Sequence, residues 1–186
     1  MAVAALERDT ELMLRVRDGD SASFVLLLER HRAPVIHFLY RMVQNQGVAE
    51  ELAQEVFLRV YRSRSSYEPS AKFTTWLFRI TTRLAWNWIR DGRYEKSDEA
   101  IGERAGSISD RAPNAEQSML REAKMAEVRA AIESLPPKQK AAVLMHKYQE
   151  MDYREIAAVL KLSESATKSL LFRAYETLRG QLKEFV

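Results

Sequence analysis

The chain has 186 residues, of which 46% are hydrophobic and 30% charged, and its formal net charge is +3. This composition is typical of a soluble globular protein with one medium domain or two small ones. The chain contains no cysteine, which excludes disulfides, thiolate metal sites and a cysteine nucleophile. With no leader-type segment and no apolar run long enough to span a bilayer, we expect a cytoplasmic protein that does not itself insert into a membrane.

The charges are segregated along the chain. Between Arg59 and Arg93 there are eight basic residues against two acidic ones, whereas between Glu95 and Glu116 there are six acidic residues against three basic ones. Such segregation is expected when the basic segment binds a polyanion and the acidic segment only connects two parts of the chain.

Few glycines and prolines and no strand-like alternation predict a mainly helical protein. The apolar spacing predicts a short first helix over about residues 10–17. A second helix, capped by Asp20 or Ser21, is expected to run to about Val43, with a bend or break at Pro34 because proline removes a backbone donor.

The segment 48–62 predicts a third helix with a stripe of small and branched apolar residues on one side. Its other face combines acidic, amide and leucine side chains: Glu51, Gln54, Glu55 and Leu58. Such a face suits a basic protein partner, although a solvated face is the commoner explanation. The following segment, 63–72, has serines, a proline and a tyrosine, and predicts a loop.

The stretch 73–93 predicts a helix with two contrasting faces, ended by Asp91 and Gly92. One stripe is apolar: Phe73, Leu77, Ile80, Leu84 and Trp88. The opposite stripe has three arginines and a tryptophan: Arg79, Arg83, Trp86 and Arg90. Guanidinium groups contact phosphates and base edges, and an indole can stack on an unpaired base, so this stripe favours nucleic acid. A solvated arginine face with Trp86 packed under a loop explains the stripe equally well when it is taken alone.

The segment from 94 to about 114 has no sustained period and contains glycines, serines and a proline, which predicts a flexible acidic linker. A helical pattern resumes over 115–133. The run Leu135-Pro136-Pro137 ends that helix and starts another, which continues to about Tyr148. We expect this helix to bury Val143, Leu144 and Tyr148. We therefore expect an all-α protein with two small helical domains joined by the linker.

The last part of the chain has the form of a helix-turn-helix. Asp152 is expected to cap a short helix, Lys161 and Leu162 to form the turn, and Ser163 to cap the second helix. The second helix has an inward stripe at Thr167, Leu171, Ala174 and Leu178, and outward residues Ala166, Ser169 and Arg173 flanked by Lys168, Leu170 and Phe172. This arrangement suits a helix in a DNA major groove, although packed helical hairpins share the pattern.

The order of these parts resembles the extracytoplasmic function (ECF) sigma factors of bacterial RNA polymerase, in the sigma-70 family. The stretches concerned are AEELAQEVFLRVYR (49–62), FTTWLFRITTRLAWNWIR (73–90) and the segment 135–179, which begins LPPKQK. The resemblance implies region two over 1–93, the linker over 94–115 and region four over 116–186. It also implies a transcription initiation factor that directs core polymerase to specific promoter DNA under the control of an anti-sigma factor. Neither enzyme activity nor a cofactor is implied, because the polymerase holds the active site.

The resemblance assigns three groups of residues. Core polymerase is expected to bind Glu51, Gln54, Glu55 and Leu58. The melted minus-ten strand is expected to contact Arg64, Tyr67, Lys72, Arg79, Arg83, Trp86, Asn87 and Arg90. The minus-thirty-five duplex is expected to contact Ser165, Ala166, Lys168, Ser169, Leu170 and Arg173.

Four positions depart from the family pattern, and one of them is Ser165, which replaces a frequent glycine. Lys161 replaces a frequent turn glycine, so that either the turn tolerates a left-handed lysine or its shape differs. Leu170 stands where a basic residue is common, and it either contacts thymine methyl groups or packs internally. Arg83 replaces a frequent asparagine, which predicts a different minus-ten preference.

Two other classes of protein are weighed against this one. A stand-alone helix-turn-helix regulator, whose first domain mediates oligomerisation, shares the second half of the pattern. An enzyme is disfavoured, because the three histidines, His31, His37 and His146, have no carboxylate cluster at metal spacing.

Overall fold

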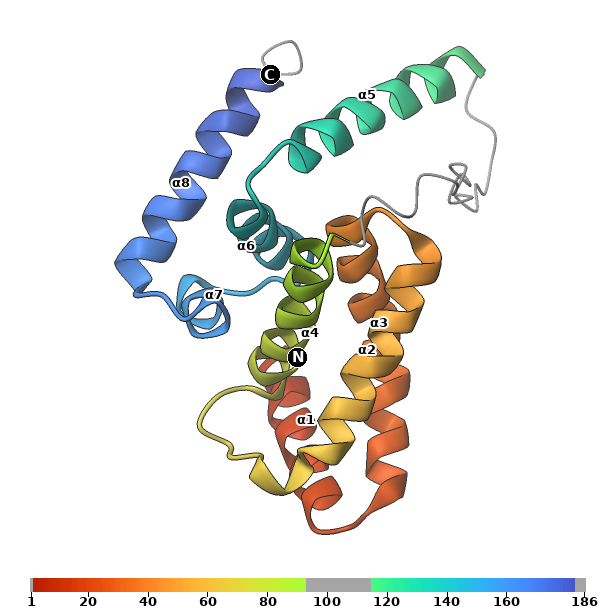
Figure 1. Cartoon of the computed structure of the whole chain (residues 1–186), viewed down its shortest axis with the longest axis vertical. Helices are drawn as coiled ribbons and strands as arrows, with labels where there is room; N and C mark the ends of the chain where they lie inside the picture. The colour runs from red at the N-terminus through yellow and green to blue at the C-terminus, as the bar shows by residue number, and fades with distance from the viewer. Residues whose placement is uncertain (1, 93–114, 183–186) are drawn as a thin grey trace.

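The computed structural model describes residues 2–92 and 115–182, and every regular element in these ranges is helical (Figure 1). The first group comprises α1 (Ala2–Arg17), α2 (Ser21–Val43), α3 (Gln46–Arg62), the short 3-10 helix η1 (Arg64–Ser66) and α4 (Phe73–Arg90). The second comprises α5 (Ala115–Glu133), α6 (Pro137–Tyr148), α7 (Tyr153–Leu160) and α8 (Glu164–Gln181). The predicted all-α fold is confirmed. The predicted linker, 94–115, lies outside the described residues except for Ala115, which begins α5.

The ends of the first helices follow local signals. Asp20 caps α2, since its carboxylate accepts hydrogen bonds from the backbone N–H groups of Ala22 and Ser23. The hydrogen bond from the Ser23 hydroxyl, followed by that from the Ser23 backbone N–H, lowers the pKa of Asp20. Helix α1 begins at Ala2 and not near Thr10, because its alanine-rich start extends the helix beyond the apolar stripe used to predict it.

Of the bend or break predicted at Pro34, the break is excluded, because α2 is continuous through this residue. Proline costs the helix one backbone hydrogen bond, but buried residues on both sides of Pro34 hold the two halves on one core. These residues are Leu27, His31, Val35, Phe38 and Leu39.

The first core lies among α1, α2, α3 and α4. Phe38 of α2 and Phe78 of α4 meet edge to face, with ring centroids 5.3 Å apart. A buried polar contact joins α1 to α2: the Asp9 carboxylate accepts a hydrogen bond from Arg30 and lies 2.8 Å from Nε2 of His31. The buried carboxylate is therefore paired, as a charge in a protein interior must be.

The predicted apolar stripe of α4 is confirmed, with Phe73, Leu77, Leu84 and Trp88 buried and Ile80 partly buried. The prediction that Tyr148 is buried is wrong, because 45% of this residue is exposed at the end of α6. Its ring instead packs beneath the guanidinium of Arg41, whose central carbon is 4.0 Å from the ring centroid. A cation-π contact accounts for a large aromatic ring in this exposed position.

The second core is formed by α6, α7 and α8 around Leu144, Ile156 and Leu171. The two groups of helices also touch each other: α4 packs against α7, and α2 packs against α6. Within the described residues, none of the helices has the length and apolar character needed to cross a membrane.

Candidate nucleic-acid interface

The arginine stripe of α4 is on the surface, but its tryptophan is not. Arg79, Arg83 and Arg90 are exposed, whereas Trp86 is partly buried and packs against the core. The indole N–H of Trp86 is buried and has no hydrogen-bond partner among the described residues. Side chains of the core therefore cover part of the Trp86 ring, which leaves less of it open for stacking than the sequence predicts.

Tyr67 is also misplaced by the sequence prediction. It is only 1% exposed, and its ring lies 5.1 Å from that of Trp76 and 6.3 Å from that of Phe73. Burial raises the pKa of its hydroxyl. Tyr67 therefore anchors the loop before α4 to the core and does not line a surface for DNA.

The remaining minus-ten candidates surround the start and end of α4. Arg64 is partly exposed and its guanidinium lies over the ring of Tyr61 at 4.3 Å. Lys72, directly before α4, forms an ion pair with Glu155. Asn87 is partly buried near the other end of the helix.

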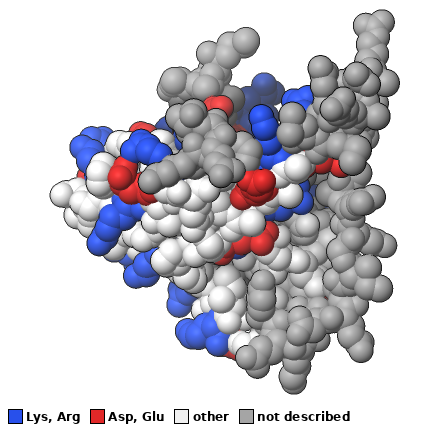
Figure 2. Space-filling model, turned by 90° about the horizontal axis from the view of Figure 1, so that it is seen from above, with Lys and Arg blue, Asp and Glu red and all other residues white. Residues whose placement is uncertain are grey.

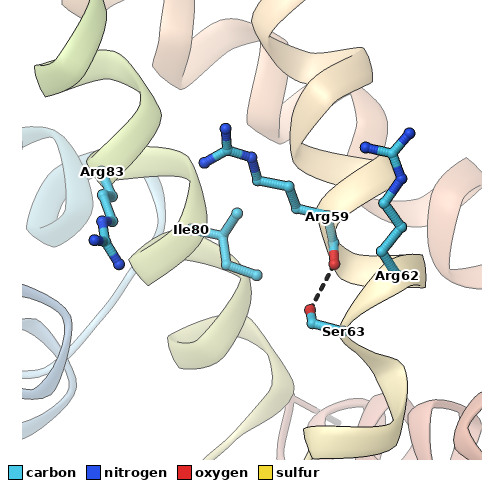
Figure 3. A pocket seen from close by; sticks show the side chains of 5 residues that line it. All are labelled: Arg59, Arg62, Ser63, Ile80 and Arg83. Atoms are coloured by element: carbon cyan, nitrogen blue, oxygen red, sulfur yellow. Dashed lines mark hydrogen bonds between the residues drawn. The ribbon is translucent and has the colours of Figure 1, made fainter.

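An open hollow of about 350 Å³ lies between the last turn of α3 and the middle of α4. Figure 3 shows Arg59, Arg62 and Ser63 on the α3 side and Ile80 and Arg83 on α4. Arg59 is paired with Glu55 at 2.6 Å, and the Ser63 hydroxyl donates to the Arg59 carbonyl. Guanidinium groups around an apolar side chain suit a nucleotide, with its phosphate on the arginines and its unstacked base on isoleucine.

The sequence prediction for the minus-ten strand named Arg83, which lines this hollow, but did not name Arg59, Arg62 or Ser63. Both arginines belong to the basic run that begins at Arg59, which was the available signal. The helical period of α3 alone does not show that these arginines lie beside α4.

The predicted docking face lies along α3. Glu51, Gln54 and Leu58 are exposed, Leu58 to 48%. Glu55 is less exposed, because its carboxylate pairs with Arg59 one turn further along. The face thus offers acidic, amide and apolar groups side by side.

The helix-turn-helix has the predicted caps. Asp152 and Glu155 form a reciprocal capping box at the start of α7, and the Ser163 hydroxyl accepts from the N–H of Ala166 at the start of α8. Lys161 has φ of 54°, so the turn retains its shape with a left-handed lysine. The inward stripe of α8 is confirmed, since Thr167, Leu171, Ala174 and Leu178 are all buried.

The outward face of α8 is formed by exposed residues, which are Ser165, Ala166, Lys168, Ser169 and Arg173. Seen from above, Lys and Arg side chains gather with some acidic ones along the edge on which α8 lies (Figure 2). Leu170 is partly buried and packs against the core, which supports internal packing over contact with thymine methyl groups. Phe172 is 66% exposed on this helix and was named only as a flanking residue.

A cluster of three aromatic rings ties α6, α7 and α8 together behind this face. Nδ1 of His146 is 2.6 Å from the Tyr175 hydroxyl, and the imidazole stacks on Tyr153 with centroids 5.5 Å apart. Burial, followed by the charge of Lys147, lowers the pKa of His146, and burial raises the pKa of Tyr175 to about 12. The cluster therefore favours a neutral imidazole whose Nδ1 accepts a hydrogen bond from the Tyr175 hydroxyl.

Potential metal ligands do not cluster in threes within residues 2–92 and 115–182.

Comparisons with known proteins agree with the division into two helical groups. Residues 27–94 match the family model for Sigma-70 region 2, and residues 125–178 match that for Sigma-70, region 4. The chain is 35% identical over 176 residues to the RNA polymerase sigma factor CarQ of Myxococcus xanthus, covering 92% of this chain and 96% of that protein. It is 30% identical over 184 residues to the ECF RNA polymerase sigma-E factor of Escherichia coli K12, covering 96% of each.

A similar fold occurs in a solved structure of CnrH in complex with the cytosolic domain of CnrY. The TM-score is 0.72 at 20% identity, and the match covers 96% of this chain and 99% of that one. The sigma factor RpoE of Bartonella quintana, solved with the anti-sigma factor NepR, gives a TM-score of 0.65 at 19% identity, covering 88% of this chain and 98% of that one.

Proposed function

The chain belongs to the ECF sigma factors of bacterial RNA polymerase, in the sigma-70 family, and from this premise we propose how its surfaces divide the work of starting transcription. Sigma factors direct core polymerase to promoters and are initiation factors, not enzymes. We assign region two to residues 1–93 and region four to 116–186, with the connecting linker over 94–115. Region two melts and holds the minus-ten strand, and region four binds the minus-thirty-five duplex.

The observation that supports the first role is the arginine-lined hollow beside α4. Strand opening requires that a base, once unstacked, is held away from its partner strand. Arg62 and Arg83 supply charge for the phosphates, and Ile80 supplies an apolar surface for the base. Arg79 and Arg90 extend the basic surface along the same helix, so that the strand follows α4.

Region four acts through the outward side of α8. A helix in the major groove meets a distinct donor and acceptor pattern at each base pair. Ser165 and Ser169 offer hydroxyls to base edges, while Lys168 and Arg173 fix the register through phosphates. Leu170 contributes by packing, so we remove it from the base-contacting set.

The face of α3 formed by Glu51, Gln54, Glu55 and Leu58 docks on core polymerase. Acidic groups steer the factor toward a basic partner, and the exposed leucine supplies apolar area at the centre. This docking requires the factor to act in the cytoplasm.

An anti-sigma factor is proposed as the further partner, as the family resemblance implies. The exposed apolar and basic residues of α3, α4 and α8 are suitable contacts for such a protein. The stand-alone regulator is not retained, because the first domain matches region two of sigma factors and not an oligomerisation module.

The test uses purified core polymerase with a fluorescent, strand-specific report of promoter melting. We expect Arg62→Gln and Arg83→Gln to reduce open-complex formation about tenfold each, with core binding unchanged, because each loses a charge-assisted contact to the strand. Arg121→Gln, an exposed arginine of α5, is the matched control. Equal loss of core binding and melting in the two test variants would refute a strand-holding role for the hollow.

A further inference from the structure

The loop of residues 68–72, directly before α4, is anchored at both ends by buried aromatic rings. Tyr67 and Phe73 are each 1% exposed, whereas the residues between them are all exposed. The two rings have centroids 6.3 Å apart, and the ring of Trp76 packs on that of Tyr67 at 5.1 Å. A short loop whose ends are fixed on one cluster has few accessible conformations, so its shape depends on that cluster.

Phe73 rests in turn on a buried histidine of α2. The ring centroids of His31 and Phe73 are 5.3 Å apart, and His31 is 7% exposed. Nε2 of the imidazole lies 2.8 Å from the Asp9 carboxylate. Because an ionised carboxylate only accepts hydrogen bonds, this nitrogen carries the hydrogen and the carboxylate fixes the orientation of the ring. Asp9 therefore orients the side chain that supports the first residue of α4.

Asp9 belongs to α1, a helix that precedes the segment matched to Sigma-70 region 2 at residues 27–94. Its side chain is 4% exposed and also accepts a hydrogen bond from Arg30. Helix α1 packs against α2, α4 and η1, so it contacts elements on both sides of the loop. Burial raises the pKa of the Tyr67 hydroxyl, against an opposing effect of Thr10, and the charge of Asp9 raises it further. Residues of α1 therefore support the loop from both of its ends.

The loop itself suits contact with a base better than contact with a phosphate. Its one acidic and one basic residue, Glu68 and Lys72, leave no net charge, and Ser70 offers a hydroxyl. The arginines of α3 and α4 are available for the phosphates. A loop that is already ordered loses little conformational freedom when a base binds to it, so residues that order the loop increase affinity without touching DNA.

We propose that Asp9 and His31 are positioning residues for promoter opening, which hold the loop 68–72 in the shape that receives an unpaired base of the minus-ten strand. They act through Phe73 and Tyr67 and do not themselves contact DNA, because both are buried. The inference rests on the proposed strand-holding function of region two. It gives Tyr67 a part in that function from beneath the surface.

The first test uses His31→Gln in the holoenzyme. Glutamine keeps a donor for the Asp9 carboxylate but removes the ring on which Phe73 rests. We expect about fivefold weaker binding of a single-stranded oligonucleotide with the minus-ten sequence of a promoter that the holoenzyme melts, because the loop is displaced from its productive position. A scrambled oligonucleotide should bind as to the wild type, and the salt dependence should be unchanged, because no cation is lost. His37→Gln, at an exposed histidine of the same helix, is the matched control.

The order of the loop is measured on the full chain without DNA. Because the chain has no cysteine, Ser70→Cys carries a single nitroxide label at an exposed position of the loop. We expect the label to move faster on the nanosecond scale when His31→Gln or Asp9→Asn is added. A label at Asp18→Cys, in the exposed turn after α1, should keep its mobility in both variants. His31→Phe retains a ring against Phe73 and should restore part of the discrimination between the two oligonucleotides.

The outcomes separate this proposal from the proposed function. If the label at position 70 moves equally with and without His31→Gln, the positioning role is overturned. If His31→Gln weakens the minus-ten and scrambled oligonucleotides by the same factor, the role of His31 is only structural and the proposal is again overturned. If Arg83→Gln holoenzyme melts promoters as the wild type does, strand holding by the hollow is overturned, whatever the label shows.

Discussion

The buried lysine of α6 allows a quantitative test of the contact between the two domains. Lys140 is 7% exposed, and among the described residues its ammonium has one hydrogen-bond partner, the Met42 carbonyl at 3.4 Å. Burial lowers its pKa, against a smaller opposing effect of Glu133. Replacing a buried charge by an apolar side chain of similar volume is commonly neutral to stabilising. We expect Lys140→Met to raise the free energy of unfolding at pH 7 by about 1–2 kcal/mol, or about 5 °C in Tm for a chain of this size.

The lowered pKa of Lys140 determines whether wild-type stability rises or falls with pH. Between the lowered folded-state pKa of Lys140 and the unfolded value of 10.5, the unfolded wild type binds more protons than the folded one. Wild-type stability therefore rises through this window, and its deficit against Lys140→Met should shrink as the pH approaches 10.5.

Urea unfolding of both proteins from pH 7 to pH 10 measures this difference. Lys138→Met, at an exposed position of the same helix, is the control and should change stability by less than about 0.5 kcal/mol. A Lys140→Met variant that is less stable than the wild type at pH 7, with a difference independent of pH, would refute the reasoning. The ammonium would then be a net stabilising cap on the carboxyl end of α2.

Three further predictions concern stability. Tyr175→Phe should reduce the loss of stability above pH 10, because the unfolded wild-type tyrosine ionises near pH 10 and the folded one only at about 12; alkaline urea titrations that superimpose would contradict this. Ser163→Ala should cost about 1 kcal/mol through loss of the α8 cap, whereas Ser165→Ala, beyond the cap, should cost little in the same thermal scans. Asp9→Ala should cost about 3 kcal/mol, because it leaves Arg30 and His31 without their buried carboxylate; a denaturation midpoint equal to that of the wild type would show that the contact adds nothing.

Local signals predicted most of the fold. The caps at Asp20, Asp152 and Ser163 need only side chains and backbone N–H groups within three residues, so the sequence contains all the information they require. The stripe of α4 is equally local, because the helical period alone places Phe73 and Leu77 on one side. The sequence predictions failed at positions where packing between distant segments of the chain determines the structure. Pro34 stays helical because of packing on both sides, which periodicity along one helix does not encode.

The two aromatic errors have a common physical cause. Trp86 was predicted to stack on an unpaired base because an aromatic ring beside arginines is typical of single-strand binding, whereas Tyr67 was assigned to the minus-ten strand by the family resemblance. The same rings also contribute large apolar areas to a core, and in a small domain this use competes strongly. The sequence predicts the direction in which an aromatic side chain points from its helix. Whether that side chain is exposed to solvent depends on the other elements that pack over it. For Tyr67 the covering elements are the rings of Phe73 and Trp76.

The hollow beside α4 is a surface feature that the sequence alone did not predict. The hollow forms only where the last turn of α3 lies beside the middle of α4, and neither helix alone marks a binding site. The surface proposed for a melted strand therefore consists of arginines, one isoleucine and one serine. Such a surface holds phosphates more strongly than it stacks bases. Strand capture by this factor should consequently depend steeply on salt, and an abasic substitution opposite Ile80 should weaken it less than removal of either Arg62 or Arg83.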